Sequence, residues 1–343
     1  MKKASIPVAP LEDQRRIVAE IEKQFSRLDE AVANLKRVKG NLKRYKAAVL
    51  KAAVEGELTE QWRKQNPDVE PASKLLERIL AERRAKWEEA ELAKMKEKGK
   101  VPKDDKWKRR YKGPTPWKIE NLPTLADSWS WASVDQLANP HPNSITDGPF
   151  GSNLKTEHYQ DSGPRVIRLQ NIKDGTFSDE YAHISEVHFN RLRKHEVFSD
   201  DLVIATLGEN PPRACIVPPG VGPAIVKADC IRFKPHSALS VAYLNMALNC
   251  QPTRLQVKNE LRGIGRPRVP LGKIRAIALP IPPTEEQRVI AAEVESRVSI
   301  INSIDYQVDA NINRADRQRQ SILARAFAGR LDDLVGEQEV SSG

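Results

Sequence analysis

Two long stretches of the chain repeat apolar residues at alternating intervals of three and four positions, with polar residues between them. In the first stretch the apolar residues are Val18, Ile21, Phe25, Leu28, Val32, Leu35, Leu42 and Val49. In the second stretch they are Ala291, Val294, Val298, Ile301, Val308, Ile312, Ala315 and Ile322. This spacing gives each helix one apolar stripe and is sustained for about five heptads. The pattern predicts two long helices that pair as a coiled coil, each about 60 Å long if roughly forty residues are helical.

Charged residues interrupt both apolar stripes. Lys39 and Lys46 do so in the first stretch, and Asp305 and Arg319 in the second. Polar residues in a coiled-coil seam cost stability but fix the register and the choice of partner. If the helices pair antiparallel about their centres, Asp305 lies near Lys39. We therefore expect these two residues to set the register.

The two stretches are copies of one sequence. PVAPLEDQRRIVAEIE starts at Pro7, and PIPPTEEQRVIAAEVE starts at Pro280, 273 positions later. The same offset aligns VLKAAVEGEL (49–58) with ILARAFAGRL (322–331) without a gap. Each copy has prolines first, acidic residues in the first helical turn and a glycine at the far end, which are ordinary helix start and stop signals. The chain therefore contains an internal repeat whose copies bracket a different kind of sequence.

Between the repeats the pattern changes to short apolar runs separated by turn residues. WSWASVDQL, PRVIRLQNI, DDLVIATL, RACIVPP and AIVKADCIRFKP are typical of strands, and SVAYLNMALNCQPTRLQVKNEL of a helix. The predicted fold class is α+β: one globular α/β-type domain flanked by two long helices that form an antiparallel coiled coil. The predicted division is 1–58 for the first helix, 59–121 for a helical and basic connector, 122–279 for the globular domain and 280–343 for the second helix.

Positive charge is concentrated in the first third of the chain. Residues 1–122 hold 31 Lys/Arg against 20 Asp/Glu, whereas the remaining residues hold 25 against 26, within a formal net charge of +10. Such asymmetry favours a polyanionic partner, nucleic acid before a membrane surface, over an ordinary solvated helix surface. The densest stretch, KMKEKGKVPKDDKWKRRYKGPTP (94–116), has ten cations and three acids. Two interpretations stay open for it: a solvated linker, or a segment that follows nucleic-acid phosphates with Trp107 and Tyr111 among its cations.

The sequence offers few signs of catalysis, metal binding or export. The three cysteines, Cys215, Cys230 and Cys250, form no C-x-x-C pair, and the six histidines have no metal-ligand spacing, so we expect no disulfide framework, metal or cofactor. Neither a signal peptide nor an apolar run near 18 residues is present, which indicates a reduced, cytoplasmic protein. ENPPR (209–213) is similar to the N-P-P-[YF] motif of amino-methyltransferases, but Arg213 replaces the aromatic residue that would stack on an extruded base. No catalytic residue is predicted, and the protein itself is expected not to be an enzyme.

Several motifs taken together resemble a known family. The proline-rich start of each long helix, the stretches DGPFGSNLK and GPRVIRLQNIKDG, and the closing GIGRPRVPLGKIRAIALPIPPTEEQ resemble the specificity subunit of type I restriction-modification systems. The resemblance covers nearly the whole chain. It implies a non-catalytic subunit whose globular target recognition domain reads one half of a bipartite DNA site. It also implies docking to methyltransferase (modification) subunits, and through them to the restriction subunit.

The chain departs from that family in one respect. A subunit of the family usually carries two recognition domains, each followed by a long helix, and the two helices pack antiparallel. Here only MKKASI precedes the first helix, and it aligns with IRAIAL (274–279), the last residues of the recognition domain. The chain therefore resembles the C-terminal half of a two-domain subunit. Self-association as a half-subunit dimer would supply the second domain; the alternative is an inactive truncated fragment.

A basic stretch near the end of the globular domain, RLQVKNELRGIGRPRVPLGKIR, has glycines that would let its loop approach a DNA backbone closely. Arginine can form two hydrogen bonds with guanine and asparagine can pair with adenine, whereas lysine more often touches phosphate. The predicted contacts with double-stranded DNA are Lys155, Arg168, Asn171, Arg213, Arg262, Arg266 and Arg268. Arg165 and Arg168 share a strand, so one of them is expected to be an ordinary surface residue. The competing hypothesis is a coiled-coil scaffold whose central domain binds protein; charge reversal at 262–275 would distinguish the two.

Overall fold

The protein has a long helix near each end and sheets between them. The computed structural model describes residues 8–100, 102–117, 122–208, 210–258 and 268–329. The chain divides into two compact units, one formed by 1–46 with 296–343 and the other by 47–295. The long helices α1 (Leu11–Glu55) and α8 (Thr284–Phe327) contribute to both units, and the described strands lie in the second. The predicted α+β class is confirmed.

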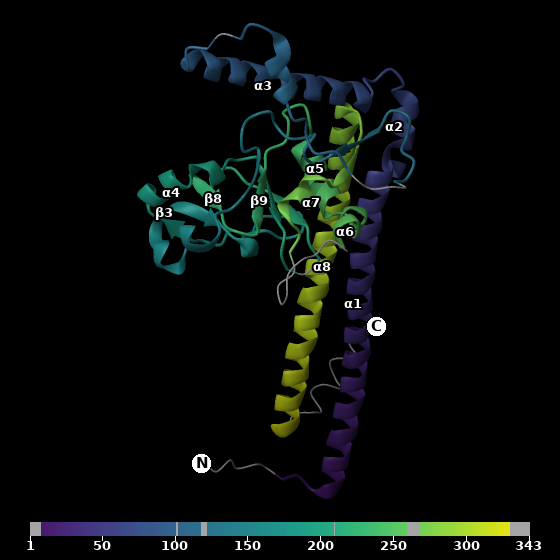
Figure 1. Ribbon diagram of the computed structural model, residues 1–343. Helices are drawn as coiled ribbons and strands as arrows, with labels where there is room; N and C mark the ends of the chain where they lie inside the picture. Colours follow the sequence, from purple (N-terminus) through teal and green to yellow (C-terminus); the bar gives the residue numbers. More distant parts are fainter. Residues whose placement is uncertain (1–7, 101, 118–121, 209, 259–267, 330–343) are drawn as a thin grey trace. The chain divides into compact units, whose positions relative to one another are not determined.

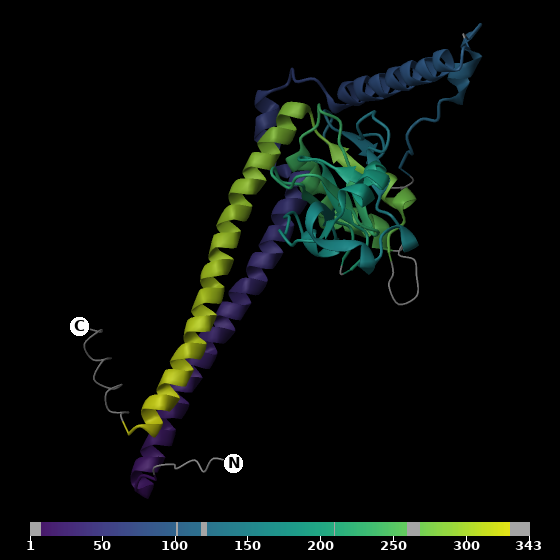
Figure 2. The same cartoon turned by 90° about the vertical axis from the view of Figure 1, so that its left-hand side faces the viewer.

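In the first unit, α1 and α8 run antiparallel and lie side by side in both views (Figures 1 and 2). Lys39 pairs with Asp309; Asp29, ten residues earlier in α1, pairs with Arg319, ten residues later in α8. The Arg319 guanidinium also lies over the Phe25 ring, 5.0 Å from its centre. These contacts confirm the predicted antiparallel coiled coil within this unit.

Lys39 is the main polar contact between the two helices. Its Nζ donates to Asp309 at 2.6 Å from both carboxylate oxygens, and it lies 3.9 Å from Asp305. The hydrogen bond to Asp309 raises the pKa of Lys39. The expectation that Asp305 lies near Lys39 is therefore confirmed, but Asp309 is the closer partner. The long, flexible lysine side chain reaches past the seam to the next helical turn.

Burial along the two apolar stripes is uneven. The α8 residues that recur every seven positions and are only 5–8% exposed are Ile301, Val308, Ala315 and Ile322. The α1 residues that recur every seven positions and are half-buried are Ile21, Leu28, Leu35 and Leu42. Val49 and Val294 belong to the second unit, where both are buried. Within the helix pair, the apolar stripe of α8 is thus covered more completely than the apolar stripe of α1.

Short strands make up three sheets in the described part of the second unit. A two-stranded sheet pairs β1 (Ser130–Ser133) with β10 (Ala278–Ile281). A four-stranded sheet has the order β2 (Ile145–Asp147), β9 (Cys230–Phe233), β6 (Leu202–Ala205) and β7 (Arg213–Ile216). The other has the order β4 (His183–Ile184), β3 (Tyr159–Ile167), β8 (Ala224–Val226) and β5 (Glu196–Val197). Neighbouring strands are antiparallel except β3 and β8, which are parallel.

Shorter helices connect and cover these sheets. The α-helices are α2 (Glu60–Gln65), α3 (Ala72–Glu97), α4 (Glu186–Arg191), α5 (Val241–Asn249), α6 (Gln251–Lys258) and α7 (Leu271–Arg275). The single-turn or short 3-10 helices are η1 (Glu57–Thr59), η2 (Asp105–Arg110), η3 (Gly151–Asn153), η4 (Thr156–His158), η5 (Leu169–Asn171) and η6 (Arg193–His195).

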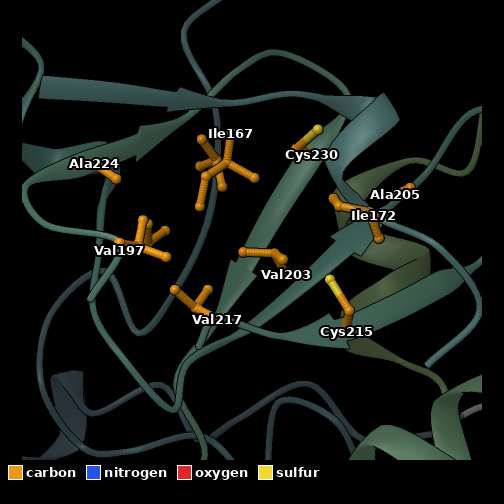
Figure 3. Close-up of a cluster of buried hydrophobic side chains, with 11 residues drawn as sticks. Ile167, Ile172, Val197, Val203, Ala205, Cys215, Val217, Ala224 and Cys230 are labelled. Atoms are coloured by element: carbon orange, nitrogen blue, oxygen red, sulfur yellow. The ribbon is translucent and has the colours of Figure 1, made fainter. Parts of the chain in front are cut away.

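One apolar cluster combines residues from both four-stranded sheets (Figure 3). Ile167 of β3 comes from one sheet, and Val203 of β6 and Cys215 of β7 come from the other. Because successive strand residues point to opposite faces, Val166 instead packs in a second cluster with Phe189 of α4. Burial raises the pKa of the Cys215 thiol to about 12, so this side chain stays neutral and acts as a small core residue. This cluster packs the two four-stranded sheets together.

A buried carboxylate joins the start of α8 to the end of the first repeat and to the globular part. Glu286 is fully buried and accepts hydrogen bonds from Thr59 Oγ1 (2.6 Å), Arg63 Nη1 (2.6 Å) and Trp129 Nε1 (2.9 Å). It also lies in the first turn of α8, where the helix dipole favours negative charge. A buried carboxylate with three donors is well satisfied, so losing one partner would be costly.

Both repeats start with the same glutamine contact. Gln14 Nε2 donates to the Ala9 carbonyl (2.6 Å), and Gln287 Nε2 donates to the Pro282 carbonyl (2.9 Å). Gln287 also accepts from the Ser240 N–H (2.9 Å) and is fully buried, whereas Gln14 is exposed. The repeat in sequence is thus a repeat in local structure, and the second copy is additionally fixed to the globular part.

Three further sequence features can be located. No described helix is long and apolar enough to cross a membrane. All three cysteines are buried and unpaired, and no cluster of three or more His, Cys, Asp or Glu side chains in the described ranges could hold a metal ion. The four-part division at residues 58, 121 and 279 stays a prediction, because the two compact units divide the chain within the long helices.

Candidate nucleic-acid interface

Two cations follow the parallel strands β3 and β8 at one edge of their sheet. Ile167 and Val226 are paired, and the Lys227 N–H donates to the Ile167 carbonyl (2.8 Å). Because the carboxyl ends of parallel strands meet at the same edge, Arg168 and Lys227 emerge next to each other. Both are half-buried, so part of each side chain reaches solvent.

A glycine fastens the loop after β2 beside Lys227. A Cβ atom on Gly148 would lie 2.1 Å from the backbone carbonyl carbon of Lys227, so only glycine fits there. The Gly148 N–H donates to the Cys230 carbonyl (3.1 Å), and His195 donates through Nδ1 to the Asp147 carbonyl. Burial lowers the pKa of His195, which favours its neutral ring. These contacts hold the start of the DGPFGSNLK loop at the sheet edge.

Phe150 and Arg268 form an exposed cation–aromatic pair on this loop. The guanidinium lies 4.9 Å from the ring centre; Phe150 is 40% exposed and the Arg268 side chain 48%. Arg268 Nη1 also donates to Asp229 Oδ1 (3.2 Å). A planar guanidinium stacked on a ring keeps further N–H groups to offer to a phosphate or to a guanine edge.

Arg213, the first residue of β7, lies near Arg268. A Cβ atom on Gly208 would be 3.2 Å from Arg213 Nη2, and Gly208 follows Leu207, which forms a β-bridge with Arg268. The Arg213 Nε atom is buried and has no hydrogen-bond partner among the described residues. Unsatisfied buried donors are uncommon, and a bound water or a ligand can satisfy them.

We call Phe150, Arg168, Arg213, Lys227 and Arg268 the basic edge. The sequence prediction included its three arginines but missed Lys227 and Phe150. Both had a local signal: Lys227 directly follows the strand AIV, and Phe150 is the aromatic residue of DGPFGSNLK. Neither signal could be assigned to the edge before the pairing of β3 with β8 was known.

Lys155 lies at the far end of the same loop. Its backbone N–H donates to His158 Nδ1 (3.0 Å), and its Nζ lies 3.4 Å from Glu157. The side chain is exposed. In the described structure no contact joins Lys155 to the basic edge, so it remains a separate candidate for phosphate contact.

Asn171 has a different role from the predicted one. It is 1% exposed; its Oδ1 accepts from the Arg168 N–H (2.8 Å), and its Nδ2 donates to the carbonyls of Ser178 (2.8 Å) and Glu180 (2.7 Å). The amide is thereby used to shape the turn after β3. We do not carry Asn171 forward as an adenine contact, because its amide is buried and bonded to the backbone.

The remaining predicted contacts lie outside the described residues. Arg262 and Arg266 belong to the segment 259–267, which joins the end of α6 at Lys258 to Arg268.

Comparison with known proteins bears on this interface. No family model matches the chain. The specificity subunits of the type I restriction enzymes EcoDI and EcoBI, both from Escherichia coli, are each 24% identical to it, over 332 and 331 residues respectively. The alignments cover 95% of this chain but 62% and 58% of the two relatives. The chain thus spans about three-fifths of the length of the curated relatives it matches.

A solved structure supports the same relationship at the level of the fold. A chain from a structure described as the basis of complex assembly and conformational transition of the type I R-M system matches with a TM-score of 0.59 and 15% identity. The match covers 95% of this chain and 62% of that chain. The resemblance found in the sequence motifs is therefore confirmed: over most of its length the chain is similar to specificity subunits of type I restriction enzymes.

Proposed function

We propose that this chain is the DNA-recognition subunit of a type I restriction-modification complex. It is not catalytic itself: its globular part reads one half of a bipartite duplex site. Its helices dock methyltransferase subunits, and through them the restriction subunit. The observation that carries the proposal is the basic edge, where the Arg268–Phe150 pair lies with Arg213 beside it. The names of the relatives support it independently.

The chemistry of the basic edge suits duplex DNA. Lysine and arginine contacts to phosphates position a protein on the duplex, whereas arginine forks at guanine edges read sequence. The edge supplies both residue types and one carboxylate, Asp229, that orients Arg268. Affinity for DNA should therefore fall as the salt concentration rises. In a plot of log affinity against log salt concentration, each phosphate contact should contribute about −0.9 to the slope.

Exposed apolar residues on the helix pair support the docking part of the proposal. They are Val38 (40% exposed), Tyr45 (51%), Ile300 (59%) and Ile304 (38%). Lys39 of α1 is level with Asp309 of α8, and the two helices run in opposite directions. Tyr45, six residues after Lys39, is therefore level with residue 303, six residues before Asp309. A partner helix could cover these exposed apolar side chains. We propose a methyltransferase helix as the occupant, with a second copy of this chain as the other outcome of the test.

Mutation of the basic edge tests DNA recognition directly. The double variant Arg213→Ala/Arg268→Ala should lose roughly 10-fold or more in affinity for the target duplex, since each good base contact is worth about 1–3 kcal/mol. A matched control, Arg191→Ala/Lys194→Ala, removes two cations elsewhere on the globular part and should bind like the wild type. Unchanged DNA affinity in the double variant, together with loss of a protein partner, would support the scaffold hypothesis instead.

The mass of the purified complex tests docking and stoichiometry. The chain is mixed with the methyltransferase encoded beside it, and the complex is weighed by native mass spectrometry. Two copies of each would mean a working half-subunit that reads a palindromic bipartite site. One copy of the chain with methyltransferase but no sequence-specific methylation would indicate an inactive fragment. If neither methyltransferase nor DNA binds, the proposal is wrong.

A further inference from the structure

The most positively charged stretch of the chain folds back along α3 (Figure 1). α3 ends at Glu97, and η2 returns beside it. Trp87 of α3 stacks on Trp107, with 5.9 Å between ring centres, and its ring lies 5.2 Å from that of Tyr111. We call α3 together with residues 98–117, apart from residue 101, the basic hairpin.

The base of the hairpin is fixed to the globular part. The buried residues at the start of α3 are Ala72, Leu75, Leu76 and Ile79. Glu82 lies 3.0 Å from His236 Nε2, and Arg83 bonds to Asp135. The segment that follows η2 is fixed at the same place, because the Thr115 N–H donates to Asp135 Oδ2 (2.7 Å). Asp135 thus ties both arms of the hairpin, and the hairpin is neither a free helix nor an extended linker.

The aromatic residues of the hairpin are occupied by each other. Trp107 and Tyr111 were candidates to stack on nucleic-acid bases, but both are half-buried against Trp87. The Arg84 guanidinium also covers the Tyr111 ring, at 5.9 Å. The hairpin therefore offers charge to a partner and keeps its aromatic rings for its own stability.

The charge of the hairpin is only partly neutralised within it. Glu88 and Glu91 lie within 4.0 Å of Lys108, Lys94 and Arg110. The exposed cations of the hairpin for which no carboxylate lies within 4.0 Å among the described residues are Lys96, Lys98, Lys100, Lys103, Arg109 and Lys112. All six lie within 17 consecutive positions, and four of them surround the turn that follows α3. Like charges held this close repel at moderate salt, where the screening length is about 10 Å.

The hairpin also lacks an apolar surface. Among the described residues, no large hydrophobic side chain between Tyr45 and Phe150 is exposed by more than about a third. A partner must therefore be held by charge and not by burial of apolar area. A duplex offers one phosphate charge for each 1.7 Å or so of its axis, which suits a cluster of lysines better than an isolated carboxylate does.

We propose that the basic hairpin binds the phosphates of duplex DNA without sequence preference, next to the sequence read by the basic edge. This inference rests on the proposed function only for the choice of DNA as the polyanion. The hairpin would add affinity at every sequence, and the basic edge would add discrimination between sequences.

The test removes four lysines of the turn in the full-length chain: Lys96→Ala, Lys98→Ala, Lys100→Ala and Lys103→Ala. The matched control removes four exposed cations outside the hairpin that already pair with carboxylates: Arg15→Ala, Lys23→Ala, Lys51→Ala and Lys64→Ala. Both variants change the net charge equally. Fluorescence anisotropy measures binding to a random-sequence duplex of about 30 base pairs across a salt series, where each lost phosphate contact lowers the log–log slope by about 0.9. Circular dichroism checks that helix content is unchanged.

We expect the hairpin variant to lose about two to four phosphate contacts, as read from the slope of log affinity against log salt concentration, and to bind roughly 10-fold more weakly. The control should behave like the wild type. Equal binding by the hairpin variant and the control would overturn the inference. So would a hairpin variant that keeps its DNA affinity but no longer binds vesicles rich in anionic lipid, which would make the partner a membrane. The Arg213→Ala/Arg268→Ala variant separates the two proposals. If it still selects the target while the hairpin variant loses random-sequence binding, the proposed reading surface fails and the hairpin inference stands.

Discussion

Arginines of the globular part serve two distinct purposes. Arg165 is 8% exposed, pairs with Asp179 at 2.8 Å and lies 4.5 Å from the centre of the Tyr181 ring, so it stabilises the fold. Arg268 is about half exposed and stacks on Phe150, so it can meet a ligand. The sequence prediction included Arg268 among the DNA contacts and left Arg165 out, but it could not show what separates them. Arg165 meets Asp179, 14 positions away, and Arg268 meets Phe150, more than 100 positions away. Only the folded chain brings these partners together.

Asn171 gives a residue-scale test of this distinction. Asn171→Ala removes three hydrogen bonds that a buried side chain makes with the backbone, and it should lower the free energy of unfolding by about 1–3 kcal/mol. DNA affinity of the folded variant should stay at the wild-type value. Thermal unfolding and anisotropy measure the two quantities, and Gln170→Ala, at the exposed neighbouring position, is the control. A variant of normal stability with weakened DNA binding would restore Asn171 as a base contact.

His195 makes stability depend on pH. Burial lowers its pKa in the folded state, so the unfolded chain takes up a proton first as the pH falls below about 6.5. The stabilising effect of the neutral ring is complete above that pH and is lost as the pH falls towards the folded-state pKa. We expect the melting temperature of the wild type to fall more steeply than that of His195→Gln between about pH 7.5 and pH 5.5. Parallel curves for the two proteins would show that His195 does not titrate on unfolding.

At the scale of elements, local pattern predicted the helices well and long-range contacts poorly. The heptads and the repeat gave both long helices, because those signals depend on spacing within each stretch, whereas the antiparallel pairing was implied by the family resemblance. The Glu286 cluster was missed, since its donors lie 157 to 227 positions away and an acidic residue at a helix start is ordinary. Similarly, the sequence left open that the segment with Trp107 and Tyr111 is a solvated linker, and it did not predict that both rings pack against Trp87.

The register contact between α1 and α8 can be tested by exchanging charges. Lys39→Glu places like charges against Asp305 and Asp309 and should lower the melting temperature; Asp309→Lys should do the same by repelling Lys39. The combination Lys39→Glu/Asp309→Lys restores an opposite pair and should recover most of the loss. Lys43→Glu, at an exposed position of α1, is the control for a change of net charge. Additive losses in the double variant would mean that this pair does not set the register.

At the scale of the whole molecule, equivalent residues of the two repeat copies have different surroundings. Val54 is 4% exposed, while Phe327, its counterpart 273 positions later, is 64% exposed. Ile281 is fully buried in β10, while its counterpart Val8 is 83% exposed. The sequence could not predict this difference, because the copies are alike and only one end of each packs with the globular part. Val8 and Phe327 are thus exposed apolar residues at the ends of the copies that do not pack with the globular part.

The central claim is that this chain selects the DNA sequence on which a methyltransferase acts. A genome-wide map of base methylation in cells that carry the methyltransferase tests it most directly, with this chain deleted, restored as wild type, or restored as Arg213→Ala/Arg268→Ala. We predict methylation at one bipartite motif with the wild type, and its loss both in the deletion and with the variant. A methylation map that is the same in all three strains would contradict the claim.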